Sequence, residues 1–333
     1  MTQTRTARRS TRTPRRGRTR TPGAWTRARN VLRSAFGDGE GEATRVEIGR
    51  VVKIGHGSYR DAYVTHVDFI PDPHKRSGRY AVLLPRENAP EDLDERTRRE
   101  VSLLKRLAGR ELPFRVPQGV AAVQDIDRLA LVRRFRDGFT LDMRGERQRG
   151  LEPWVVIAEI AAAIHHLDLS DFQDLLHGPA TRRAHAEEAL RILEELDDPI
   201  AEEAMSWGRR NLPGDEPSVF LHGDLVGDNV LLMPEQRSLL IDWENARIGD
   251  PAYDLARVTR AARQPFKRDD GLQRLVDAYA RKEGVPGVTA AHVRLHELCL
   301  AAGRCLRARE PWSKESPETG LEQMRDVLTR AQA

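Results

Sequence analysis

Residues 219–256 decide the fold, and they read VFLHGDLVGDNVLLMPEQRSLLIDWENARIGDPAYDLA. Three short apolar runs at 219–221, 230–233 and 239–241 predict strands, and the proline-led segment 234–238 between the last two predicts a turn. The first run leads into a polar loop, HGDLVGDN, and the last ends on an acid. The stretch therefore predicts a loop, a hairpin and a carboxylate at the end of the hairpin.

Three side chains in this stretch have the chemistry of phosphoryl transfer. Asp224 is followed by Asn229 and, across the hairpin, by Asp242. Transfer of a phosphoryl group needs one carboxylate that orients the acceptor hydroxyl and takes its proton. It also needs hard oxygen ligands for the Mg²⁺ ions that bridge the phosphates. Each acid alone is unremarkable on a loop, but their joint spacing predicts a catalytic centre.

The motifs HGDLVGDN, IDWE and GDPAYDLA resemble those of the aminoglycoside phosphotransferase family, which also contains choline, homoserine and macrolide kinases. The resemblance covers about residues 47–262. It implies an α+β, two-lobed protein-kinase-like fold with a small antiparallel β-sheet N-lobe carrying one helix, and a mainly helical C-lobe. It also implies Mg²⁺ as cofactor and ATP or GTP as co-substrate.

The resemblance assigns a role to each polar residue of the motifs. Asp224 matches the catalytic base, and Asn229 and Asp242 match the metal ligands. His222 and Asp254 match the residues that brace the catalytic loop.

Length and composition fit a two-lobed globular protein. The chain has 333 residues, of which 39% are hydrophobic, and no apolar run approaches the roughly 20 residues that span a bilayer. Cys299 and Cys305 form neither a metal pair nor a disulfide framework. These observations predict a cytoplasmic protein without membrane contact.

Residues 1–33 carry 11 arginines and no acid. We expect residues 1–40 to form a disordered tail, in which residues 30–36 could form a short helix that leads into the fold. Such a tail could contact nucleic acid or an acidic partner, could be a transit peptide, or could be a dispensable extension.

Residues 41–135 are predicted to form the nucleotide-binding N-lobe. The segment 46–70 reads as strand, turn and strand, and the turn contains Gly55, Gly57 and Ser58. Glycines let a backbone close over phosphates. Because such a turn also occurs in ordinary hairpins, its nucleotide-covering role rests on the downstream motif.

The chain departs from the family at the strand 79–84. The resemblance implies a strand cation that holds the nucleotide phosphates and pairs with a helix glutamate. Glu100, on a predicted helix 97–107, matches the glutamate, but Leu83 stands at the cation position. We expect Arg86 to compensate, with Lys53 or Arg60 as the other candidates.

Residues 131–135 are expected to form the hinge between the lobes, with Arg133 and Arg134 beside the purine, and ATP and GTP are not distinguished there. Residues 136–333 are expected to form the helical catalytic and substrate-binding C-lobe.

The segment between Asp242 and Asp254 is too short for the activation segment with which protein kinases present a peptide. It favours a small-molecule hydroxyl acceptor, such as an antibiotic or another secondary metabolite. Residues 151–250 contain 21 acids and 7 arginines, a net charge of −14, which favours a cationic acceptor unless the acids lie on solvated helix faces. A Ser/Thr kinase of a peptide and a degenerate, nucleotide-binding pseudokinase remain as alternatives.

Overall fold

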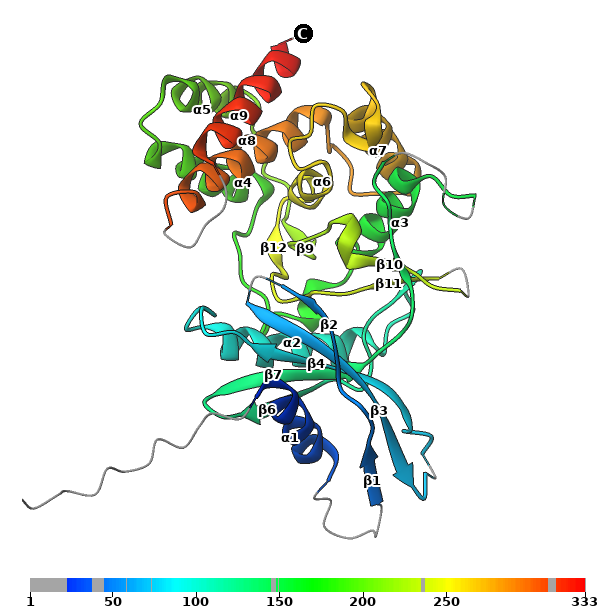
Figure 1. The fold of residues 1–333 in the computed structure, drawn as a ribbon. Helices are drawn as coiled ribbons and strands as arrows, with labels where there is room; N and C mark the ends of the chain where they lie inside the picture. The colour runs from blue at the N-terminus through cyan, green and yellow to red at the C-terminus, as the bar shows by residue number, and fades with distance from the viewer. Residues whose placement is uncertain are drawn as a thin grey trace, which may run out of the picture.

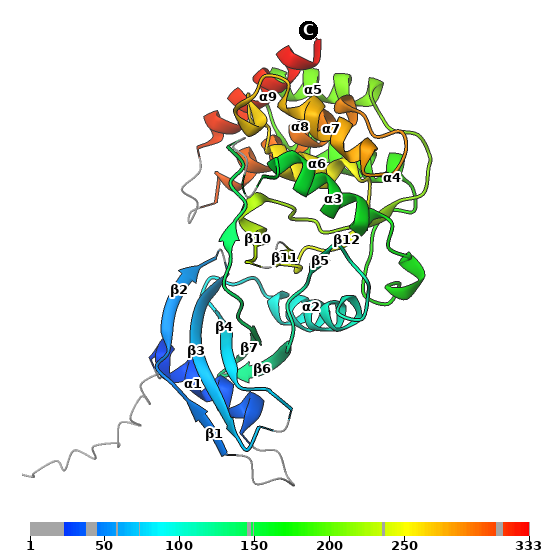
Figure 2. The same ribbon diagram turned by 90° about the vertical axis from the view of Figure 1, so that its right-hand side faces the viewer.

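The chain folds into two lobes, a β-rich N-terminal lobe and a helical C-terminal lobe (Figure 1). The fold is taken from a computed structural model, which describes residues 23–37, 45–57, 59–72, 74–144, 148, 150–234, 237–310 and 316–332. Figure 2 shows the lobes in profile, with the strands β5 (Phe114–Arg115), β10 (Val230–Leu232) and β11 (Ser238–Leu240) near their junction.

The N-lobe is built on a six-stranded antiparallel sheet in the order β1-β3-β4-β7-β6, with β2 paired to β3. The hairpin β2–β3 contains the glycine turn, as predicted. The strands are β1 (Arg45–Ile48), β2 (Val52–His56), β3 (Arg60–Ile70), β4 (Gly78–Pro85), β6 (Ala121–Asp125) and β7 (Arg128–Arg134).

Helix α1 (Ala24–Phe36) belongs to this lobe, which corrects the prediction of disorder through residue 40. Its apolar residues Ala28, Val31 and Leu32 are buried against one face of the sheet. Arg27 also donates to the buried carboxylate of Asp125, at 2.5 Å from Nη2. The arginine-rich region therefore contains a helix with a buried apolar face. Residues 1–22 lie outside the described residues.

The opposite face of the sheet is covered by α2 (Leu93–Leu107). Side chains alternate along β4, so Tyr80, Val82 and Leu84 face α1 while Leu83 packs with the core on the α2 side. The N-lobe thus has two helices where the sequence predicted one, and the α2 face is the one turned toward the catalytic residues.

The C-lobe is mainly helical, as predicted. Its central helix α3 (Pro153–His165) is almost wholly apolar and is buried. Proline stands at the first turn of α3 and of α5, where its missing N–H costs no hydrogen bond. The remaining helices are η1 (Leu169–Asp171), α4 (Arg182–Leu190), η2 (Arg191–Glu195), α5 (Pro199–Arg210), α6 (Ala252–Thr259), η4 (Pro265–Lys267), α7 (Gly271–Arg281), α8 (Ala290–Arg307) and α9 (Pro317–Gln332).

Short strands between the lobes carry the decisive stretch. The predicted hairpin is formed by β10 (Val230–Leu232) and β11 (Ser238–Leu240), with Val230 opposite Leu240. β10 also pairs with β8 (Phe139–Thr140), and β11 with β5 (Phe114–Arg115). β9 (Val219–Leu221) and β12 (Arg247–Gly249) form a second antiparallel pair, and η3 (Gly227–Asn229) leads into β10.

Two further predictions concern the whole molecule. Cys299 and Cys305 are buried free thiols, as the absence of a disulfide framework predicted. Among the described helices, none is both long enough and apolar enough to cross a membrane.

Candidate active site

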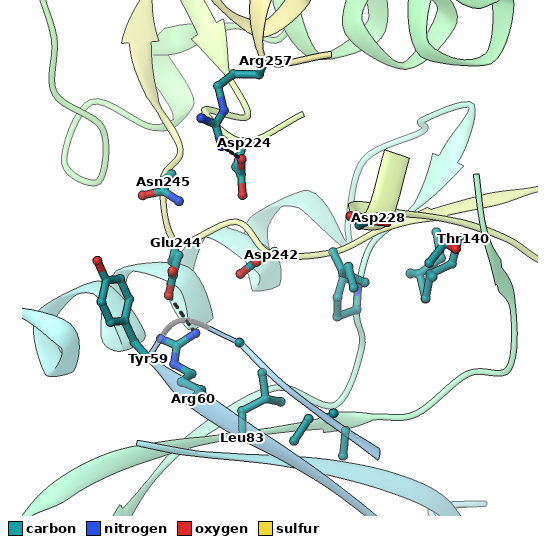
Figure 3. Close-up of a pocket in the computed structure, with 18 of the residues that line it drawn as sticks. Tyr59, Arg60, Leu83, Thr140, Asp224, Asp228, Asp242, Glu244, Asn245 and Arg257 are labelled. Atoms are coloured by element: carbon teal, nitrogen blue, oxygen red, sulfur yellow. Dashed lines mark hydrogen bonds and ion pairs between the residues drawn. The ribbon is translucent and has the colours of Figure 1, made fainter. Parts of the chain in front are cut away.

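The candidate site is a cleft of about 1040 Å³ between the lobes. Figure 3 shows Asp224 and Asp242 facing it from the C-lobe side, and Arg60 and Leu83 from the N-lobe side. Gly55 and Gly57 also line it. The structure therefore brings the predicted base, one predicted metal ligand and the glycine turn to one cavity.

The catalytic loop is held in place by the buried carboxylate of Asp254. Its oxygens accept hydrogen bonds from the backbone N–H groups of His222, at 2.8 Å, and Gly223, at 2.9 Å. Gly223 has φ +80°, and a Cβ there would lie 2.0 Å from the carbonyl oxygen of Asn245. Only glycine fits this turn, which explains the middle residue of HGD.

Asp254 is in turn oriented by His165 of α3. Tyr279 accepts from the N–H of Val285 at 2.9 Å, so its own hydroxyl proton is directed at Nδ1 of His165, 2.7 Å away. The other ring nitrogen, Nε2, then donates to Asp254 at 3.3 Å. Burial acts to raise the pKa of Asp254, but these donors outweigh it and the pKa is lowered, so the carboxylate stays charged.

His222 fastens the loop to the hairpin. Its Nδ1 accepts from the N–H of Asp224 at 3.2 Å, which leaves Nε2 to donate to the carbonyl of Ile241 at 3.1 Å. Burial lowers the pKa of His222 and favours the neutral ring that this pair of bonds requires. The bracing contacts implied for His222 and Asp254 are therefore present.

Asp224 lies at the centre of the cleft and has two side-chain partners. Asn229 donates through Nδ2 to the backbone oxygen of Asp224 at 2.9 Å and to its carboxylate at 3.3 Å. Arg257 of α6 forms an ion pair with the same carboxylate. Nothing in the sequence pointed to Arg257, because the approach of α6 to the loop of Asp224 is not local in the chain.

Asp242 stands in a region crowded with negative charge. Its φ is +69°, which turns the chain sharply at the end of the hairpin. Burial, followed by the carboxylates of Glu100, Glu244 and Asp224, raises its pKa to about 7. A nearby cation would favour the ionised form of this carboxylate.

Mg²⁺ is a suitable cation for this position. Within the described part of the chain, no group of three or more His, Cys, Asp or Glu side chains could hold a metal unaided. Mg²⁺ is usually bound by one or two carboxylates together with substrate phosphates. Asp242 and the Oδ1 of Asn229, whose Nδ2 is already engaged, match that mode.

Arg60 pairs with the helix glutamate. From the start of β3 its Nη1 reaches Glu100 and Glu244, each at 3.1 Å, and its Nη2 donates to Thr97 at 2.9 Å. The side chain is 6% exposed. One buried guanidinium thus joins the glycine-turn strand, α2 and the IDWE segment (Figure 3).

Arg133 is the second cation near Leu83. In the β4–β7 register Leu83 lies opposite Leu131, and Ala81 lies opposite Arg133. Opposed residues of antiparallel strands share a face, so Arg133 projects on the same side as Leu83, and both line the cleft. Burial lowers the pKa of Arg133, and the acids facing it are Glu100 and Asp242. Its guanidinium has no hydrogen bond or ion pair within the described part of the chain.

The side chains of the other arginines predicted to contact the nucleotide are bonded to backbone carbonyl groups instead. Arg86 is exposed, donates to the carbonyl of Gly57 at 3.0 Å and does not line the cleft. The guanidinium of Arg134 donates to the carbonyls of Lys75 and Ser77, and lies over the ring of Tyr80. Ser58 lies outside the described residues.

The acids behind the expectation of a cationic acceptor are mostly elsewhere. Of those counted in 151–250, the cleft is lined by Asp224, Asp228, Asp242 and Glu244. Residues of α4, η2, α5 and the following loop are exposed to solvent instead, among them Glu187, Glu194, Glu195, Glu202, Glu203 and Asp215. The net charge of −14 therefore does not describe the surface on which an acceptor would lie.

A buried charge network at Asp250, which sequence reasoning missed, anchors the segment after the hairpin. Asp250 accepts from Arg182 at 3.0 Å and from His296 at 2.9 Å. Burial opposes ionisation, but these donors lower its pKa to about 2. His185 accepts from the Asp250 N–H, and burial, followed by the charge of His296, lowers the pKa of His185 to about 3.

The fold has two lobes, and a glycine turn faces Asp224 and Asp242 across the cleft. These features are typical of the protein-kinase-like class of phosphotransferases. Residues 49–298 match the model of the phosphotransferase enzyme family (APH). The chain therefore belongs to this family.

Solved structures share the fold at low sequence identity. The GDP and kanamycin complex of APH(2")-IIia aligns over 90% of this chain and 98% of its own, with a TM-score of 0.68 and 16% identity. The ternary complex of a thermostable APH(4)-Ia mutant with ADP and hygromycin B covers 86% and 96%, with a TM-score of 0.59 and 16% identity. These similarities confirm the predicted two-lobed α+β architecture.

Curated sequence relatives match over shorter stretches. Acyl-CoA dehydrogenase family member 10 of Mus musculus is 34% identical over 68 residues, which is 20% of this chain and 6% of that protein. Family member 11 of Gallus gallus is 31% identical over 110 residues, which is 31% of this chain and 14% of that protein. The match therefore spans only a small part of these relatives.

Proposed function

We propose that the protein moves the γ-phosphoryl group of ATP or GTP to a hydroxyl of a small molecule, such as an antibiotic or another secondary metabolite. The observation that carries the proposal is that Asp224 and Asp242 line one cleft together with Gly55 and Gly57, while Asn229 donates to Asp224 from beside it. The neighbouring structures were solved with GDP and kanamycin and with ADP and hygromycin B, so either purine nucleotide is compatible.

In the proposed reaction Asp224 orients the acceptor hydroxyl and receives its proton. The hydroxyl oxygen forms a bond to the γ-phosphorus while the bond from that phosphorus to the β–γ bridging oxygen breaks. Nucleoside diphosphate leaves with the electron pair. Arg257 pairs with the Asp224 carboxylate and limits its rotation, and Asn229 fixes the loop behind it.

Asp242 and Asn229 are the proposed magnesium ligands. Bound Mg²⁺ would neutralise charge on the phosphates and on the crowded carboxylates. The raised pKa of Asp242 supports this assignment, because burial and the carboxylates of Glu100, Glu244 and Asp224 outweigh the positive charge of Arg133.

Arg133, assisted by Arg60, is the proposed substitute for the cation absent at Leu83. Arg60 already pairs with Glu100 and Glu244, so its positive charge is largely compensated by these two carboxylates. Arg133 faces Glu100 and Asp242 and has no hydrogen-bonded partner in the described residues. It can therefore turn to a phosphate, whereas Arg86 is tied to the outside of the glycine turn.

A small molecule is favoured over a peptide because the segment after Asp242 is fixed. Residues 247–249 pair with β9, and Asp250 is buried and bonded to Arg182 and His296. Nothing between Asp242 and Asp254 extends to form a platform for a peptide chain.

The test is a nucleotide-consumption assay. ATP and GTP are each supplied with Mg²⁺ and a panel of aminoglycosides, macrolides, nucleosides, hydroxy acids, sugar phosphates and Ser-containing peptides. We expect acceptor-dependent diphosphate release with a small molecule and a phosphorylated product of the expected mass. Release only with peptides, or nucleotide binding with no transfer to any acceptor, would contradict the proposal.

A further inference from the structure

Beyond Asp224 the cleft opens onto a surface dominated by arginine. The floor is apolar, formed by Ala261, Leu300 and Ala301. A second cavity of about 640 Å³ shares Arg96, Arg257 and Arg307 with the cleft and extends toward α2 and α4. We call seven of the arginines that line the two the arginine wall: Arg96, Arg99, Arg247, Arg257, Arg260, Arg304 and Arg307.

The arginine wall has more positive than negative charge. Asp92 pairs with Arg96 at 2.7 Å, and Asp224 pairs with Arg257. The other acids lining the two cavities are Glu95, Glu188, Asp228, Asp242 and Glu244. In all, eleven arginines and seven acids line the two cavities, so positive charge is in excess on this lining.

Arg99, Arg247 and Arg260 form no ion pair within the residues that the structure describes. Arg99 donates to the backbone carbonyl of Glu244, and Arg247 to that of Asn245 while lying 5.3 Å from the ring centre of Tyr253. Burial lowers the pKa of Arg99, and the nearby charges of Arg96 and Arg247 lower it further. The exposed Arg260 has no ion pair in the part of the chain that the structure describes.

The wall is placed where an acceptor must lie. Arg257 contacts the carboxylate that is proposed to take the hydroxyl proton. Arg260 follows one turn later at the end of α6, with φ +54°. Arg304 and Arg307 are three residues apart on α8 and so lie on one face of that helix. A molecule whose hydroxyl reached Asp224 would have its remaining groups among these side chains.

We infer that the acceptor is an anion: a small hydroxyl compound carrying carboxylate or phosphoryl groups that pair with the arginine wall. Arginine presents paired N–H donors that match both groups bidentately. A polycationic acceptor would meet repulsion on the same surface. This inference rests on the proposed function and names the substrate class for it.

Binding of a small anion tests the inference without a known acceptor. The full chain is saturated with Mg²⁺ and ADP, so that the nucleotide site is filled, and is titrated calorimetrically at low ionic strength with citrate, with inorganic phosphate and with kanamycin. Citrate and phosphate separate a carboxylate preference from a phosphoryl preference. We expect at least one anion to bind with ADP present, and kanamycin to bind more weakly.

Variants locate the site. In Arg260→Gln with Arg307→Gln we expect anion binding about tenfold weaker, a loss of roughly 1.4 kcal/mol. Arg281→Gln, an exposed arginine of α7 that lines neither cavity, should match the parent. If the double variant melts at a lower temperature, Arg260→Gln alone gives the same comparison at an exposed position.

Three outcomes would overturn the inference: no anion bound once ADP is present, equal binding by the parent and the double variant, or tighter binding of kanamycin than of either anion. Mg²⁺-dependent nucleotide binding is measured separately. If nucleotide fails to bind while the anion still binds and depends on the wall, the proposed function fails and the anion site stands.

Discussion

The two sides of the cleft are built in different ways. On the C-lobe side, Asp224, Asn229 and Asp242 come from one continuous stretch, and Asp254 follows Asp242 by twelve residues. On the N-lobe side, the charges near the nucleotide come from β3, α2 and β7. A loop and a hairpin can specify the first arrangement locally, whereas only the packing of a sheet and a helix assembles the second.

The largest effect is expected on the locally specified side. Asp224→Asn removes the proton acceptor, and general-base catalysis contributes about 10²–10⁴-fold to rate. We expect turnover to fall by that factor while nucleotide affinity stays nearly the same. The neighbouring cleft acid provides a control, because Asp228→Asn should stay close to the parent. Equal turnover in Asp224→Asn and the parent would exclude Asp224 as the base.

Loss of the two proposed metal ligands should weaken Mg²⁺-dependent nucleotide binding to different extents, because one ligand is charged and the other is neutral. Asp242→Ala removes an anionic ligand, whereas Asn229→Ala removes a neutral one, so Mg²⁺-dependent nucleotide binding should fall further in Asp242→Ala. Titrations of Mg²⁺ against each variant, followed by nucleotide binding, measure the difference. A parent-like titration for Asp242→Ala would remove this residue from the metal site.

Substitutions in α1 test whether the stability of the N-lobe depends on this helix, which lies outside the N-lobe predicted from the sequence. Leu32→Ala empties a fully buried position and should cost roughly 2–5 kcal/mol of unfolding free energy. Ser34→Ala, at an exposed position of the same helix, should change stability little. Denaturant unfolding of both variants measures the two costs, and equal stability would mean that α1 is not part of the core.

The replacement for the missing strand cation gives a smaller effect on the N-lobe side. Hydrogen bonds to charged groups contribute about 1.5–3 kcal/mol, so Arg133→Met should raise the nucleotide KM and lower kcat by a combined factor of roughly ten or more. Arg86→Ala should change both far less. Adding Leu83→Lys to Arg133→Met should restore part of the loss. If Arg86→Ala has the larger effect, the compensation runs through the glycine turn instead.

The site was predictable where chemistry and spacing coincide in the chain. HGD, the Asn five residues after its Asp, and IDWE mark a loop and a hairpin whose geometry is local, and His222 and Asp254 make the bracing contacts that the resemblance implied. The hairpin register confirmed the pairing of the second and third apolar runs. By contrast, Arg257 and the Asp250 network depend on helices far away in sequence.

One expectation failed, and the argument behind a second lost its support, for a related reason. An arginine-rich composition suggested disorder up to residue 40, but the spacing of Ala28, Val31 and Leu32 gives α1 a buried face. A count of acids suggested a cationic acceptor, but a count over 100 residues does not tell which side of a helix each acid occupies. In both cases a composition summed over many residues carried no information on the direction in which each side chain points.

The sequence by itself determined the phosphotransferase family, the two-lobed fold and the loop and hairpin that carry the predicted site residues, because a hairpin places groups a few residues apart by local backbone geometry. Only the tertiary structure decided which cations stand near Leu83 and which charges surround the acceptor. Arg60 meets Glu100 across 40 positions and Glu244 across 184, and Arg257 meets Asp224 across 33. Such contacts arise when sheet and helices pack, and their partners carry no signature in the order of the chain.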